Sequence, residues 1–155
     1  MSLATKPLPA AEAIDLIDFD LTMVRFKLAN PEEGAPWTPD KLELADREYR
    51  RYMALCLAYP DEDIVPCQLV DKMWHQHILD TAAYRADCLR VFGKFHDHFP
   101  YFGLRGPDDA ANLENAYNVT LDLYVANFGD TPAGAWQAAN GKSKCRAGCR
   151  PMKCK

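Results

Sequence analysis

The sequence lacks the features of membrane proteins and of β-sheet proteins. None of its apolar runs approaches the roughly 18 residues that a membrane-spanning helix requires. Alternation of apolar and polar residues, which is typical of a half-buried strand, is nearly absent. Glycine is scarce as well, with eight residues among 155. We therefore expect an all-α protein without a membrane-embedded segment.

Several catalytic motifs are also missing. There is no G-x-S-x-G nucleophile elbow and no phosphate-binding P-loop, so a serine-type hydrolase or a nucleotide-binding enzyme is not expected. Neither an H-E-x-x-H motif nor a facial triad of two histidines and one carboxylate is evident from the spacing.

The composition is that of one soluble globular domain, with 48% apolar and 26% charged residues. Near the N-terminus, acids at Glu12, Asp15 and Asp18 precede any long apolar run, so we expect no secretory signal. A cytoplasmic location follows as a prediction, and the six cysteines are then expected to be reduced thiols.

Charge divides the chain into two parts. The net charge is −4, and the last 16 residues contain six positive charges and no acid, which leaves −10 in residues 1–139. An acidic body is unlike a nucleic-acid-binding surface. We expect a helical domain over 1–139 and a flexible, basic, cysteine-containing tail over 140–155, which offers a docking segment for a protein partner.

The apolar spacing of the body predicts a single-domain bundle of about five to six helices. Thr38 and Pro39 provide an N-cap and a first helical residue, and Gly93 provides a helix end. The expected helices cover 12–29, 39–58, 66–79, 82–92 and 109–128, with a short one around Trp136.

All four histidines occur in two His-x-His pairs, and the first pair is His75 and His77. Positions two apart on a helix point about 200° apart, so these two side chains cannot chelate one ion on an unbroken helix. His77 shares the apolar face, where it could meet the loop that contains the second pair. His75 lies one turn after Asp71, which suits either a shared metal or a carboxylate that orients the imidazole. The alternative is a core histidine and a surface ion pair.

The second pair, His96 and His98, lies in a loop rich in histidine, proline and glycine. An extended segment would place both side chains on one side as a usable chelate. The alternative is a packed aromatic loop, with Tyr101 and Phe102 filling the core beneath it. Neutral imidazole is the commonest metal ligand, so a transition metal such as zinc, copper or iron is the expected cofactor.

The tail adds a different ligand type, because Cys145, Cys149 and Cys154 have basic neighbours that favour thiolate. Three soft ligands suit Cu(I), or zinc completed by another group. Redox disulfides, a modified or docking tail, and incidental cysteines are the alternatives. Cys56 and Cys88 are expected in the core, and Cys67 is ambiguous.

The block V-D-K-M-W-H-Q-H-I-L-D-T from Val70, with the later Tyr84, Asp87, Cys88, Gly93 and H-D-H-F-P, resembles the glycine-rich domain-containing protein family. The similarity covers roughly residues 12–105. It implies that Asp71, Trp74, His75, His77 and a loop histidine are important, and it supplies no established activity. The chain departs from the family in having no glycine-rich tract.

Three functions are compatible with these observations. The first is a small metal-binding protein whose His/Asp site and thiolate tail bind or transfer a transition metal. The second is a metal-dependent enzyme in which Asp71, His75, His77 and His98 hold zinc or iron and activate water. The third is a partner-binding adaptor whose His/Trp block is structural.

Overall fold

The computed structural model describes residues 8–137, and within that range it contains helices and no β-strand. The predicted all-α fold is confirmed. The α-helices are α1 (Ala10–Ala13), α2 (Thr22–Ala29), α3 (Pro39–Ala58), α4 (Gln68–Leu79), α5 (Thr81–Phe92) and α6 (Pro107–Phe128), and a 3-10 turn, η1 (Ile14–Leu16), follows α1.

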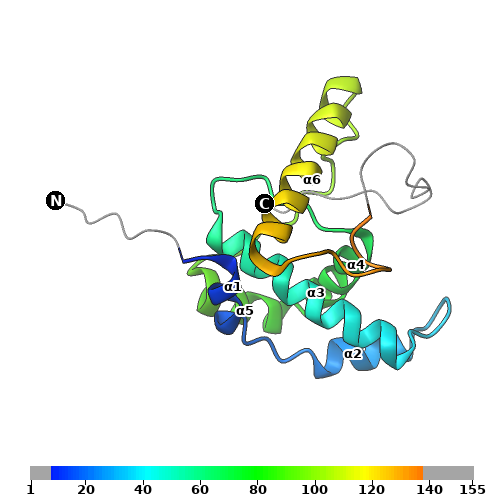
Figure 1. Cartoon of the computed structure of the whole chain (residues 1–155). Coiled ribbons are helices and arrows are strands. Elements are labelled where there is room, and N and C mark those ends of the chain that lie inside the picture. Colours follow the sequence, from blue (N-terminus) through cyan, green and yellow to red (C-terminus); the bar gives the residue numbers. More distant parts are fainter. Residues whose placement is uncertain (1–7, 138–155) are drawn as a thin grey trace.

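Helix α3 is the centre of the fold. It packs against α1, α2 and α4, and Figure 1 shows it crossing the middle of the molecule with α6 rising from the body. Its inward side chains Tyr49, Tyr52 and Met53 are completely buried. Thr38 caps the helix by accepting a hydrogen bond from the Lys41 amide at 3.2 Å, as the sequence predicts.

The N-terminal segment differs from the single helix predicted for 12–29. Residues between η1 and α2 are not helical, and alternate residues Ile17, Phe19 and Leu21 are buried. Arg50 of α3 binds this segment by donating to the carbonyl oxygens of Ile17 at 3.1 Å and Phe19 at 2.9 Å. An unwound backbone exposes these carbonyls to the guanidinium, so a tertiary contact overrides the helical spacing.

The short helix predicted around Trp136 is also absent from the described part of the chain. Residues 133–135 form a turn, and Trp136 is buried with its indole N–H donating to Glu48 Oε2 at 2.9 Å. The same oxygen accepts from the Tyr124 hydroxyl at 2.6 Å, while Glu48 Oε1 pairs with Arg47 and Arg51. A fully buried carboxylate thus connects α3 to α6 and to the segment after it.

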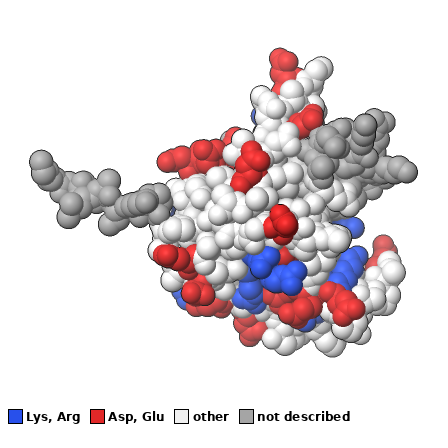
Figure 2. All heavy atoms as spheres, viewed as in Figure 1, with Lys and Arg blue, Asp and Glu red and all other residues white. Residues whose placement is uncertain are grey.

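Charged side chains are mixed over the surface. Figure 2 shows acidic side chains spread over the face that carries α3 and α6, with the basic side chains of that face lying among them. Arg25, for example, pairs with Glu43 at 3.2 Å and with Asp46 at 2.9 Å. That the body does not bind nucleic acid stays a prediction. None of the helices described between residues 8 and 137 has the length and apolar character needed to cross a bilayer.

Candidate metal centre

Helix α4 positions two of the candidate ligands. Its first turn contains Asp71, whose side chain is 6% exposed, and one turn later His75 is 47% exposed. The helical repeat places both on one face, and His75 Nε2 lies 3.4 Å from Asp71 Oδ2. The predicted proximity of this pair is therefore present in the structure.

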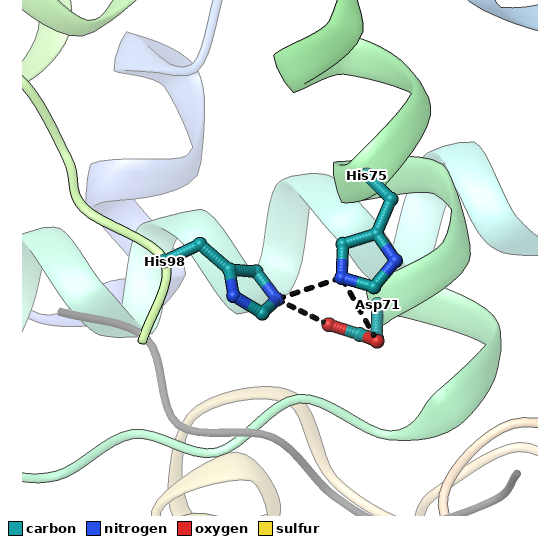
Figure 3. A group of neighbouring side chains, drawn as sticks. All are labelled: Asp71, His75 and His98. Carbon is teal, nitrogen blue, oxygen red and sulfur yellow. Dashed lines mark hydrogen bonds and ion pairs between the residues drawn. The ribbon is translucent and has the colours of Figure 1, made fainter. Parts of the chain in front are cut away.

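A third group reaches the same point from the loop between α5 and α6, residues 93–106. His98 Nε2 lies 2.8 Å from Asp71 Oδ1 and 2.9 Å from His75 Nε2. Figure 3 shows the two imidazoles converging above the carboxylate, one from the helix and one from the loop. Two histidines and one carboxylate thus form a cluster that could hold a metal ion, and all three are among the candidate ligands named from the sequence.

The separations within the cluster can be compared with those of metal ligands. With metal–ligand bonds of roughly 2.1 Å, two ligands at 90° are about 3.0 Å apart, and two at the tetrahedral angle are about 3.4 Å apart. His98 Nε2 lies 2.8 Å from Asp71 Oδ1 and 2.9 Å from His75 Nε2, and the 3.4 Å separation joins His75 Nε2 to the other carboxylate oxygen, Asp71 Oδ2. One donor atom from each residue lies within 4.8 Å of the others, so the three side chains are close enough to share one ion.

The protonation state of His75 suits this role. Burial lowers the pKa of His75, and the adjacent His98 lowers it further, while the Asp71 carboxylate acts in the opposite direction. A lowered pKa favours neutral imidazole near neutral pH, which is the form that binds metals.

His77 lies apart from this cluster, in the core. Its Nδ1 is 2.7 Å from the Tyr49 hydroxyl and its Nε2 is 2.8 Å from Asp87 Oδ2, so both ring nitrogens have side-chain partners. The inward orientation agrees with the apolar stripe of α4. The two hydrogen-bond partners of the His77 ring come from α3 and α5, and not from the 93–106 loop as the sequence suggested. His77 as a metal ligand stays an untested prediction.

Replacement of His77 by alanine should lower the free energy of unfolding by about 1–3 kcal/mol, because it creates a void and leaves buried polar partners without their hydrogen bonds. His75→Ala should cost less in metal-free protein, since that side chain is half exposed. Urea unfolding of both variants in the presence of chelator measures the difference. Equal losses, or a larger loss for His75, would contradict the burial argument.

His96 is also outside the cluster. Its ring stacks on Phe92 of α5 with centroids 4.5 Å apart, whereas His98 meets Asp71 and His75. A role of His96 as a second metal ligand of the loop stays an untested prediction. Of the two aromatic residues expected to plug the core, Phe102 is buried and Tyr101 is exposed.

The remaining candidates are cysteines. Cys145, Cys149 and Cys154 lie outside the described residues. Cys56 and Cys88 are buried as predicted, and so is Cys67, which the sequence left ambiguous. Burial raises the pKa of Cys67 to about 12, so it is a protonated core residue.

A cavity of about 470 Å³ adjoins the cluster. His98 forms part of its wall, and the rest of the lining is mainly aromatic: Ile78, Tyr84, Phe95, His96, Asp97 and Phe99. The volume falls in the range of small-molecule pockets. The His98 imidazole therefore belongs both to the cluster and to the cavity wall.

Comparison with known proteins corrects the family suggested by the sequence motif. The chain matches a family described as UCP032817-like over residues 18–122. No curated protein and no solved structure matches it. The assignment to the glycine-rich domain-containing family, which depended on the D-x-x-W-H-x-H block and a few scattered residues after it, is wrong, because the family model that matches is a different one. The matched region covers most of the chain and contains every member of the cluster, and the protein belongs to the UCP032817-like family.

Proposed function

We propose that the protein binds one divalent transition metal ion through Asp71, His75 and His98. The observation that carries this proposal is the convergence of three side chains, two from a helix and one from a distant loop, each of which offers a donor atom within 4.8 Å of the others. In the metal-free protein, His98 Nε2 lies within hydrogen-bond distance of both His75 and Asp71. A metal ion could replace the protons between these atoms, because two imidazoles and a carboxylate are a common ligand set.

The donor set favours iron(II) or zinc over Cu(I). Two histidines and one carboxylate with open positions are typical of non-haem iron(II) sites, and three nitrogen or oxygen ligands are typical of catalytic zinc. Cu(I) prefers soft sulfur ligands, and the cluster offers none among residues 8–137.

Metal loading should be stoichiometric and should stabilise the fold. We expect one iron or zinc ion per chain after loading and desalting. An ion present at 100 times its Kd should raise the free energy of unfolding by about 2.7 kcal/mol, because it binds only the folded state. Elemental analysis and thermal unfolding with and without chelator measure both effects.

His96→Ala is the matched control, because it removes a histidine of the same loop that lies outside the cluster. This variant should retain the ion. Substoichiometric metal in the wild type, with no change of stability on loading, would refute the proposal and favour the adaptor function.

A metal-dependent enzyme is the second candidate, and two observations favour it. Three protein ligands leave coordination positions open to water or substrate, and the cavity that shares His98 could hold a small molecule. Nitric oxide added to the iron(II)-loaded protein probes those positions. An iron–nitrosyl signal in electron paramagnetic resonance would support an open site, and its absence would favour binding or transfer alone.

We further propose that residues 140–155 form a separate unit that adds thiolate ligands in the reducing cytoplasm. A chain ending at residue 139 should keep the ion of the helical domain and lose any additional thiolate-bound metal. Loss of the single His/Asp-bound ion on truncation would show that the two parts act as one site.

A further inference from the structure

The loop that supplies His98 is held by a chain of two hydrogen bonds. The indole N–H of Trp74 on α4 donates to the Tyr84 hydroxyl at 2.9 Å. The Tyr84 hydroxyl, on α5, donates in turn to the backbone carbonyl oxygen of His96. This carbonyl lies two residues before His98, so the two hydrogen bonds connect α4 and α5 to the loop close to the candidate ligand.

Trp74 and Tyr84 are both buried side chains that belong to helices. Trp74 is completely buried and Tyr84 is 1% exposed. Each belongs to a helix, whereas residues 93–106 contain none. The Tyr84 hydroxyl donates to the loop, so a loop that moved would leave this buried O–H without its acceptor.

Trp74 also contacts the candidate ligand directly. Its ring centroid lies 4.2 Å from that of His98, and the His75 ring lies 4.6 Å from His98. The His98 imidazole therefore packs against two residues that are adjacent in the sequence of α4. One of them is a member of the cluster, and the other is joined through Tyr84 to the loop backbone.

We propose that Trp74 and Tyr84 are positioning residues that hold His98 in its ligand position before a metal ion arrives. This inference rests on the proposed metal site. A preformed position spares the ion the entropic cost of ordering the loop, which would otherwise weaken its affinity. In this proposal Trp74 has a role beyond packing in the core, because it contacts both Tyr84 and His98.

Tyr84→Phe tests the proposal, because it keeps the ring and removes only the hydroxyl. We expect the affinity for zinc, measured by competition with a chromogenic chelator, to fall by about 10–100-fold, the usual effect of losing a group that orients a metal ligand. Tyr124→Phe is the control: it removes a hydroxyl on α6 that donates to the buried Glu48 and accepts from Arg51, neither of which belongs to the cluster. It should lower the thermal midpoint while leaving the zinc affinity of the folded protein within about threefold of wild type, since distant sites act independently.

A double-mutant cycle separates positioning from general destabilisation. If Tyr84 acts through His98, Tyr84→Phe should have little effect on the residual affinity of His98→Ala protein. An equal loss of affinity in both backgrounds, or wild-type affinity in Tyr84→Phe, would overturn the proposal.

Exchange of the Tyr84 hydroxyl proton, followed by nuclear magnetic resonance in the metal-free wild type, supplies a test that needs neither a variant nor a bound metal, because this proton is the one donated to the loop. Slow exchange, little changed by zinc, would support a preformed loop. Fast exchange that slows only when zinc binds would overturn the proposal and leave the metal site standing. Absence of zinc binding together with a slowly exchanging hydroxyl proton would instead refute the metal site alone.

Discussion

Asp71→Asn is expected to lower metal affinity by at least about 100-fold, the upper end of the effect of losing a group that only orients a ligand. The change keeps the size of the side chain and removes its charge. Asp71 is the only acid of the cluster, and its two oxygens face His98 at 2.8 Å and His75 at 3.4 Å. Asparagine would replace one of these oxygens by an NH2 group. This group donates hydrogen bonds and has no electron pair available to coordinate a metal ion.

Chelator competition with zinc measures this loss, and Asp97→Asn is the matched control. Asp97 is an exposed carboxylate of the same loop, next to His98 in the sequence, and it lines the cavity outside the cluster. We expect the control to bind zinc as the wild type does. Equal affinities for the two variants would exclude Asp71 as a ligand.

Glu48→Ala is expected to lower the free energy of unfolding by about 3–5 kcal/mol, as for other buried charged groups that lose one partner. The carboxylate is fully buried and accepts hydrogen bonds from Tyr124 at 2.6 Å and from the Trp136 indole at 2.9 Å. Alanine leaves both donors buried without an acceptor and opens a void beside them.

Urea unfolding measures the effect, with Glu43→Ala as the control on the same helix. Glu43 is 72% exposed and pairs with Arg25, so its loss should change stability by less than about 1 kcal/mol. A loss below about 1 kcal/mol for Glu48→Ala would show that the buried carboxylate contributes little net stability.

The sequence predicted those parts of the structure that depend on neighbours along the chain. The helical spacing of apolar residues predicted helices α3 to α6 and the inward orientation of His77. The four-residue spacing of Asp71 and His75 predicted that these two side chains lie close together. Each of these follows from helix geometry alone. The buried cysteines Cys56 and Cys88 followed from the same stripes.

The missed features depend on contacts between distant segments. His96 and His98 were both candidate ligands, and the choice between them depends on the path of the loop, which the Tyr84 hydroxyl contacts at the His96 carbonyl. Spacing cannot show that path. Nothing near Glu48 in the sequence indicates that Tyr124 and Trp136 donate to it. A charged residue on the apolar side of the α3 stripe was the only available signal.

The separation of the clustered groups along the chain has a topological consequence. Asp71 and His98 are 27 positions apart, and the whole of α5 lies between them. An ion bound by both residues would act as a reversible cross-link, much as a disulfide does, and would close a loop of the chain that contains α5. This cross-link would reduce the number of conformations available to that segment when it unfolds locally. A backbone cut between α5 and His98 would then leave two fragments joined through the ion, and a chelator would sever that connection.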